Sequence, residues 1–189
     1  MNVLAVLLAA GGGTRFTGPT HKLDATMGDG RSVYAHAVEQ LSRSGAAHLA
    51  VVHGTEARDV PAGVRSLMNA RWAEGQATSM AVAVEAAREL GVDALVVGLA
   101  DQPFVPASAW RQIITAPPHW PIVVATYAGR RGPHPVRLAQ PVWPLLPPIG
   151  DDGARSVLRE HADWVLEVPC DGSADDIDTV EDLARWTSS

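Results

Sequence analysis

Two basic residues follow a run of three glycines near the start of the chain, and this combination suits the binding of an anion. The glycines are Gly11, Gly12 and Gly13, and the basic residues are Arg15 and Lys22. Glycine lets the backbone turn sharply and approach a ligand closely. A loop with exposed N–H groups followed by cations is therefore suited to a polyphosphate. The alternative is a glycine-rich turn that carries two solvated cations.

Lys22 is the one lysine in a chain whose other basic residues are fourteen arginines. A compact ammonium in a chain that otherwise uses arginine indicates a contact with phosphate. The spacing excludes two better-known phosphate loops. A P-loop requires lysine after its second glycine, but Pro19 follows Gly18 here. A dinucleotide fingerprint requires a third glycine where Phe16 stands.

A second loop carries hydroxyl groups at the expected start of a helix. Gly75, Thr78 and Ser79 lie just before an apolar segment over residues 80–90 that has helical periodicity. Thr78 or Ser79 can cap this helix, and the N–H groups at its start would form a second edge for an anion. The alternative is an ordinary capped helix.

Two aspartates stand at positions where a carboxylate can bind a ligand. Asp101 directly follows the apolar run 94–100, and ligands of open α/β sheets bind beyond the carboxyl ends of strands. Asp178 precedes Thr179, which can cap the last helix together with Asp182. The alternative for Asp101 is a turn-forming or capping role.

The elements that must position these residues alternate between strand and helix. Apolar runs predict strands over 3–10, 48–53, 64–69, 94–100, 121–127 and 164–169. Helices are expected over 32–41, 80–90, 107–114 and 155–161, and after Thr179, with a short one over 56–59. One interpretation of residues 133–136 is an extended, proline-rich edge segment. The pattern predicts an α/β fold with a mostly parallel sheet covered on both faces, in one domain over residues 1–189.

Composition narrows the class of protein. The net charge of −6 gives no general support for binding nucleic acid. Cys170 is the one cysteine, so no internal disulfide can form, and a structural role is favoured over catalysis. No apolar run approaches the length of a membrane span. We therefore expect a cytoplasmic protein that binds neither nucleic acid nor membrane.

Several segments together resemble the MobA-like nucleotidyltransferases, and most of all their molybdenum cofactor cytidylyltransferase (MocA-like) branch. They appear in the family's order between residues 3 and 183. They are Ala9-Ala10-Gly11-Gly12-Gly13-Thr14-Arg15-Phe16 with Lys22, Trp72 with Gly75 to Ser79, Leu99-Ala100-Asp101-Gln102-Pro103, Gly150-Asp151-Asp152-Gly153-Ala154-Arg155, and Asp176-Ile177-Asp178-Thr179-Val180-Glu181-Asp182-Leu183.

This resemblance implies a three-layer, Rossmann-like nucleotidyltransferase fold and a set of site residues. Arg15, Lys22 and Asp101 would be catalytic. The nucleotide would be bound by Ala9, Ala10, Gly11, Gly12, Gly13, Arg15, Lys22, Gly75, Thr78, Ser79 and Asp101. Asp101 and Asp178 would hold Mg²⁺. His134, in a segment similar to the family's Gly-His-Pro-Val, and Arg155 would bind the acceptor.

The reaction implied by the resemblance moves CMP from CTP to the phosphate of molybdenum-bound molybdopterin. The product would serve a molybdenum hydroxylase, directly or through a maturation factor. In the resembling families Ala-Ala-Gly accompanies cytosine nucleotides and Ala-Gly-Gly accompanies guanine nucleotides, and a methyl group at Ala10 would narrow the slot for a purine. Other acceptors remain open: an isoprenoid phosphate, phospholactate or a sugar phosphate. A non-catalytic carrier of the cofactor is a further alternative.

Overall fold

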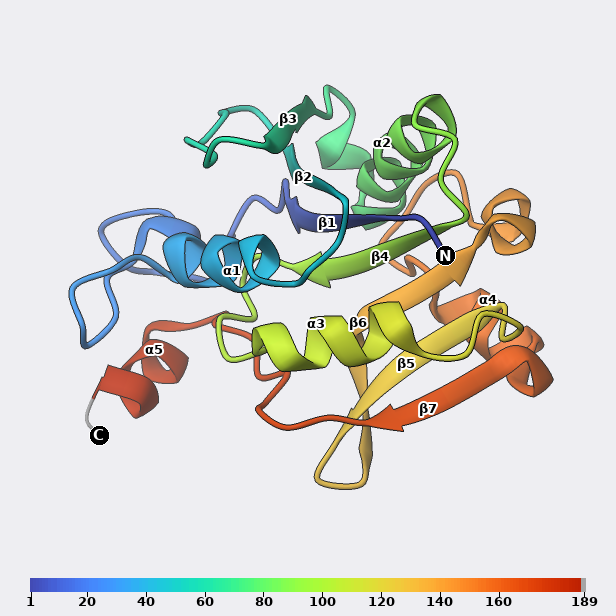
Figure 1. Ribbon diagram of the computed structural model, residues 1–189. Helices are drawn as coiled ribbons and strands as arrows, with labels where there is room; N and C mark the ends of the chain where they lie inside the picture. The colour runs from blue at the N-terminus through green and yellow to red at the C-terminus, as the bar shows by residue number, and fades with distance from the viewer. Residues whose placement is uncertain (188–189) are drawn as a thin grey trace.

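The computed structural model describes residues 1–187 and shows one sheet between two layers of helices (Figure 1). The strands in this part of the chain are β1 (Val3–Ala9), β2 (His48–His53), β3 (Val64–Met68), β4 (Ala94–Leu99), β5 (Ile122–Tyr127), β6 (Arg130–Ala139) and β7 (Val165–Pro169). Their order is β3-β2-β1-β4-β6-β5-β7, and β6 alone among them runs antiparallel to its neighbours. The predicted α/β fold with a mostly parallel sheet is confirmed.

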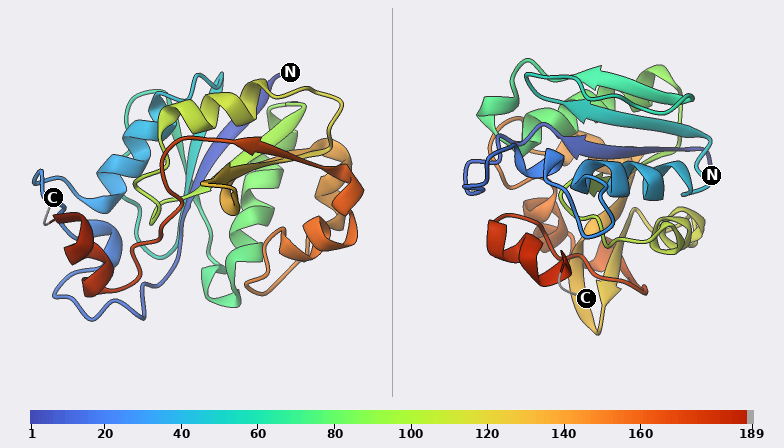
Figure 2. Two further views of the ribbon diagram at one scale, coloured as in Figure 1. Left: turned by 90° about the horizontal axis from the view of Figure 1, so that it is seen from below. Right: turned by 90° about the vertical axis from the view of Figure 1, so that its left-hand side faces the viewer.

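Helices lie on both faces of the sheet, as the two views in Figure 2 show. One face is covered by α1 (Val33–Ser42) and α3 (Ala107–Thr115), the other by α2 (Gln76–Glu89) and α4 (Arg155–Glu160). The last helix, α5 (Val180–Thr187), lies beyond the end of the sheet where the loop after β1 also lies (Figures 1 and 2). Short 3-10 turns span Lys22–Asp24, Trp72–Glu74, Gln140–Leu145 and Ala162–Trp164.

Strand β1 is buried on both faces because β2 and β4 flank it and helices cover it above and below. Its side chains alternate between the two cores. Val3, Ala5 and Leu7 pack on the α1 and α3 side, while Leu4 and Leu8 pack on the α2 side. A strand that is apolar at every position is what burial on both faces requires.

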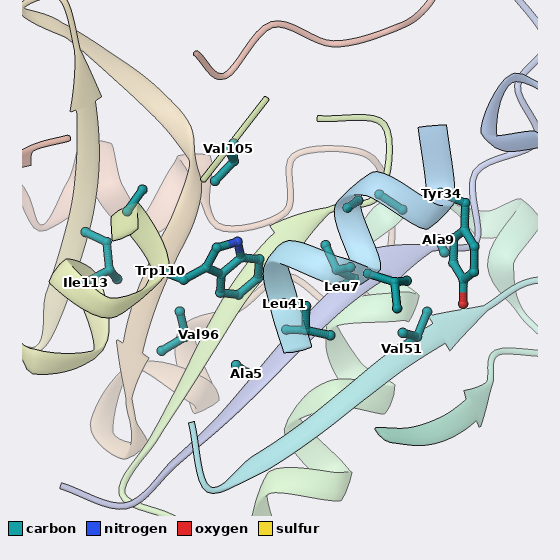
Figure 3. Close-up of a cluster of buried hydrophobic side chains, with 14 of the residues drawn as sticks. Ala5, Leu7, Ala9, Tyr34, Leu41, Val51, Val96, Val105, Trp110 and Ile113 are labelled. Carbon is teal, nitrogen blue, oxygen red and sulfur yellow. The ribbon is translucent and has the colours of Figure 1, made fainter. Parts of the chain in front are cut away.

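A buried tryptophan packs against β4 near the end of the strand. The indole of Trp110, on α3, lies over the sheet near Leu7 and Val96 (Figure 3). A Cβ atom on Gly98 would lie only 2.5 Å from this indole, so the ring fits because position 98 has no side chain. Asp101 follows three residues after Gly98, just beyond the end of β4.

Strand β6 differs from the expected proline-rich edge segment, because it lies inside the sheet between β4 and β5. Proline cannot donate to a strand ladder, which argues for an edge. The structure resolves this conflict with a shift of register between Val124 and Thr126 of β5, opposite residues 132–135. The prolines stand where the ladder is interrupted, so their missing N–H groups leave no ladder bond unmade.

Two smaller expectations were also wrong. Residues 56–59 form no helix, because this segment is held by side-chain contacts, among them a hydrogen bond from Arg58 N to His53 Nδ1 (3.4 Å). Helix α2 begins at Gln76, before the predicted residue 80. Among the described helices, none is long and apolar enough to cross a membrane.

Candidate active site

The candidate site lies at the carboxyl ends of two neighbouring parallel strands. Leu8 of β1 pairs with Leu99 of β4, and Ala100 N donates to Leu8 O at 3.0 Å. The glycine loop that follows β1 therefore lies beside Asp101, which follows β4. This is the edge of a parallel sheet where ligands commonly bind.

Lys22 lies between the two aspartates that the sequence analysis assigned to a metal ion. Its Nζ donates to Asp101 Oδ2 at 2.6 Å and to Asp178 Oδ1 at 2.9 Å. The lysine is 8% exposed. Burial acts to lower the pKa of this ammonium, but the charges and hydrogen bonds of Asp101 and Asp178 outweigh burial and raise the pKa above its usual value. Lys22 is therefore charged at every physiological pH.

Arg15 and an unpaired oxygen complete this cluster. The Arg15 guanidinium pairs with Asp178 Oδ2 at 2.9 Å, and its side chain is 74% exposed, at the mouth of the site. Asp101 Oδ1 is buried and has no hydrogen-bond partner within residues 1–187. A buried carboxylate oxygen without a partner is costly, and it fits a site that receives a further ligand.

The carboxylates suit a hard divalent cation, which prefers oxygen ligands. Within the described residues, no group of three or more His, Cys, Asp or Glu side chains is arranged to hold a metal ion. Two carboxylates are nevertheless enough for Mg²⁺, which usually keeps several waters and takes its other ligands from substrate phosphates. The residues present therefore fit Mg²⁺ that binds together with a nucleotide.

Local structure explains why Asp178 reaches this place. Thr179 Oγ1 accepts from Asp182 N at 3.1 Å, and Asp182 Oδ2 accepts from Thr179 N at 2.9 Å. This reciprocal cap starts α5 as predicted. Ile177, which is fully buried, donates its N–H to Asp101 O at 2.8 Å. The residue after Ile177 is thereby held next to Asp101.

A third aspartate lies in the same cleft, and the sequence analysis did not single it out. Burial, together with the negative charges of Asp101 and Asp178, raises the pKa of Asp176 to about 6. Its Oδ1 accepts from Gln102 Nε2 at 2.8 Å. The motif around Asp178 contained this residue, but nothing in its spacing distinguished it from a solvated carboxylate.

The glycine loop is held in shape by a network that sequence reasoning also missed. The His21 ring bonds to Gly11 O through Nε2 at 3.0 Å, and its Nδ1 accepts from Leu23 N at 3.2 Å. The guanidinium of Arg58 lies 3.1 Å from the same Nδ1 and pairs with both oxygens of Asp24. With Nδ1 accepting, the proton of a neutral His21 is on Nε2 and is donated to the loop.

The start of α2 differs from the expected anion edge. Gln76 N donates to Asp151 Oδ1 at 3.1 Å and Ala77 N donates to Gly150 O at 2.9 Å, so these N–H groups already have partners. Gly75 stands directly before them at φ +106°, and a Cβ atom there would lie 2.4 Å from the backbone of Gly150. Only glycine permits this approach.

The hydroxyls of Thr78 and Ser79 are buried against Asn69 and do not cap α2. Asn69 Nδ2 donates to both Oγ atoms at 2.9 Å, and Thr78 Oγ1 donates to Arg71 O and Gly75 O. Asn69 thereby fixes the loop that carries Trp72, which packs against the glycine loop. A buried asparagine with this role has no periodicity that sequence analysis could use.

These elements surround a cleft of about 680 Å³, a size typical of ligand sites. Most of the predicted site residues line it: Ala10, Gly11, Gly12, Arg15, Gly75, Ser79, Asp101, Arg155 and Asp178. Ala9, Gly13, Lys22 and Thr78 are not among its lining residues, and Lys22 lies behind the two carboxylates. Trp72 also lines the cleft.

A second pocket of about 310 Å³ adjoins the cleft, because Gln76 and Arg155 line both. His134 and two further arginines, Arg131 and Arg159, lie in its wall. Burial, assisted by the positive charge of Arg155, lowers the pKa of His134 to about 3, so this histidine is neutral. Its Nδ1 has no partner among the described residues.

Comparison with known proteins agrees with this arrangement. The model of the MobA-like NTP transferase domain matches residues 5–165. The purine catabolism protein PucB of Bacillus subtilis strain 168 is 32% identical over 122 residues, which are 61% of this chain and 58% of PucB. The chain thus spans less than two thirds of the length of this curated relative.

Solved structures share the whole fold. The crystal structure of Rv0371c from Mycobacterium tuberculosis H37Rv has a TM-score of 0.80 at 26% identity, covering 100% of this chain and 98% of that one. The manganese complex of the same protein gives 0.73 at 24% identity, covering 100% and 99%. The nucleotidyl transferase Mth528 of Methanothermobacter gives 0.80 at 21% identity, covering 99% and 96%. The chain belongs to the MobA-like NTP transferase domain family.

Proposed function

We propose that the protein transfers CMP from CTP to the phosphate of molybdenum-bound molybdopterin. A phosphate oxygen of the acceptor attacks the α-phosphorus of CTP, the bond from that phosphorus to the β-phosphate oxygen breaks, and pyrophosphate leaves. The observation that carries the proposal is the contact of Lys22 with Asp101 and Asp178 at the base of a cleft bordered by the glycine loop.

This chemistry depends on position and charge more than on a protein nucleophile. Asp101 and Asp178 would hold Mg²⁺, which supplies positive charge to the phosphates when bound. Arg15, exposed at the mouth of the cleft, would pair with the triphosphate, as would Lys22 once the carboxylates are neutralised. The acceptor phosphate is already anionic and needs little help from a general base.

The acceptor would occupy the pocket that adjoins the cleft. Arg155 lines both spaces, so its guanidinium can pair with the acceptor phosphate near the α-phosphorus. The neutral ring of His134, with Val136 and Leu158, forms a wall for the uncharged body of the acceptor. A cavity of about 310 Å³ suits a compact phosphorylated molecule.

Selection of cytosine is supported by Ala10, which lines the cleft and is 8% exposed. A methyl group at the end of β1 narrows the slot and disfavours a purine. The name of PucB, a purine catabolism protein, is compatible with a product that serves a xanthine-dehydrogenase-like molybdenum hydroxylase. The carrier hypothesis is less favoured, since a carrier does not need a buried lysine between two aspartates. We also propose that the protein acts in the cytoplasm.

The test is pyrophosphate release from each nucleoside triphosphate in turn, with Mg²⁺ and four acceptors. Molybdopterin carrying molybdenum is compared with an isoprenoid phosphate, a sugar phosphate and phospholactate. We expect turnover with CTP and molybdopterin, and none when Asp101→Asn replaces the wild type. Turnover with another acceptor, or with GTP in preference to CTP, would overturn the proposed specificity. Turnover with none of them would overturn the proposed reaction.

A further inference from the structure

Asp178 lies in a segment that follows a strand which is not a neighbour of β4 in the sheet. The segment 170–178 follows β7, which lies three places from β4 across the sheet. The Lys22 ammonium, which contacts both Asp101 and Asp178, and two backbone hydrogen bonds join this segment to the turn after β4. Ile177 N donates to Asp101 O at 2.8 Å, and Ser173 N donates to Phe104 O at 3.3 Å.

Gln102 adds two further polar contacts to this seam. Its Nε2 donates to Ala174 O at 3.0 Å and to Asp176 Oδ1 at 2.8 Å. The side chain is 2% exposed, and its Oε1 is buried without a partner in the described chain. Since both neighbours are acceptors, the amide must direct its N–H₂ group toward the segment.

A glutamine in this position carries a cost that an apolar residue would avoid. The unpaired Oε1 has lost its water and gained no partner, whereas a leucine of similar size would bury no polar atom. What a leucine would not provide is the pair of hydrogen bonds that fix residues 174 and 176, two to four positions before Asp178. The role of Gln102 is therefore to place this segment.

We propose that Gln102 and Asp176 are positioning residues, which act together to hold Asp178 against Asp101 at the distance that a metal-bound nucleotide requires. This inference rests on the proposed function, in which Asp101 and Asp178 hold the metal. Groups that hold metal ligands in place typically change metal affinity by about 10- to 100-fold when they are removed. Asp176 acts through its hydrogen bond and not as a ligand.

Metal binding tests this without relying on turnover. Mn²⁺ binding is measured by electron paramagnetic resonance with a non-hydrolysable CTP analogue present. We expect Gln102→Leu and Asp176→Ala each to weaken Mn²⁺ binding by about 10-fold or more. Asp176→Asn should stay within about 3-fold of the wild type, because an asparagine oxygen still accepts from Gln102 Nε2. Near-normal Mn²⁺ binding by Asp176→Asn distinguishes a hydrogen-bonding role of Asp176 from a role as a charge or as a metal ligand.

Two controls keep the outcomes distinct. Gln140→Leu removes another amide contact, from Nε2 of the exposed Gln140 to Val92 O at 2.8 Å, and should leave Mn²⁺ binding unchanged. Asp101→Asn should abolish it; if it does not, the metal site of the proposed function is wrong. Circular dichroism shows whether Gln102→Leu and Asp176→Ala are folded. If these folded variants bind Mn²⁺ normally while Asp101→Asn does not bind it, only the positioning role is refuted. Equal losses in Asp176→Asn and Asp176→Ala would also overturn it.

Discussion

Replacing Lys22 with methionine removes the ammonium and keeps a side chain of similar length. Nζ lies 2.6 Å from Asp101 Oδ2 and 2.9 Å from Asp178 Oδ1. At an effective dielectric constant of about 20, each contact corresponds to about 6 kcal/mol of attraction before desolvation of the three groups is subtracted. Removing one partner of a buried pair typically costs about 3–5 kcal/mol. We expect the free energy of unfolding at pH 7 to fall by about 3 kcal/mol.

The same change should have the opposite effect on metal binding by the protein alone. Lys22 holds one oxygen of each carboxylate, so a cation must compete with the ammonium for both. Without the ammonium, Asp101 loses its cationic partner and Asp178 keeps only the exposed Arg15 among the described residues. We expect Lys22→Met to bind Mn²⁺ at least 10-fold more tightly than the wild type in the absence of nucleotide. Turnover should nevertheless fall by about 100-fold or more, since the triphosphate loses a cation.

Urea denaturation and Mn²⁺ titration by electron paramagnetic resonance measure the two effects on the same samples. Arg15→Met is the matched control, because Arg15 pairs with Asp178 alone and is exposed. Such a surface pair contributes little, and this variant should change both quantities only slightly. A folded Lys22→Met protein that binds Mn²⁺ no more tightly than the wild type would refute the reasoning that the ammonium occupies the position of the metal.

Four further changes have defined outcomes. Asp101→Asn should lower kcat by about 100-fold or more in protein that circular dichroism shows to be folded, and near-normal turnover at saturating Mg²⁺ would contradict the metal assignment. The raised pKa of Asp176, about 6, means that ionising it destabilises the fold. The free energy of unfolding of the wild type should therefore fall by about 1–2 kcal/mol between about pH 4 and pH 7 relative to that of Asp176→Asn, once solvent screening is allowed for. Urea denaturation in EDTA measures both proteins across this pH range, and a constant difference between them would contradict the prediction. Ala10→Gly should raise kcat/KM for GTP by about 10-fold or more without loss of CTP use. Gly75→Ala should destabilise the protein by about 2–4 kcal/mol, whereas Gly91→Ala, also at positive φ but with open space around it, should cost about 1 kcal/mol in thermal denaturation.

The sequence predicted the parts of the fold whose own residues determine them. Strand β1 is apolar at every position, and nothing but a strand buried on both faces accommodates that run beside a glycine loop. Helix α5 carries its own reciprocal cap from Thr179 and Asp182. The interior position of β6 had no such signal, since its prolines argue for an edge unless the neighbouring register is known. That register belongs to β5, so no local pattern could have revealed it.

The sequence located many residues of the candidate site, but it did not reveal the contacts between them. Glycine spacing and strand ends located Gly11, Lys22 and Asp101, because these signals are local. The partners of Lys22 are separated from it by 79 and 156 positions, and only the folded chain brings them together. Gln102 was visible merely as the residue after Asp101. Its importance lies in a hydrogen bond to a segment 74 positions away.

The geometry also explains why the one lysine of the chain is here. A single Nζ atom contacts an oxygen of both carboxylates, which a compact ammonium with three donors can do. The planar guanidinium of an arginine would instead pair side by side with one carboxylate and fill the space between the two. Arg15 pairs with Asp178 Oδ2 through one terminal nitrogen, from the exposed side of the cluster. The lysine at position 22 therefore contacts one oxygen of each carboxylate and leaves Asp101 Oδ1 without a partner among the described residues.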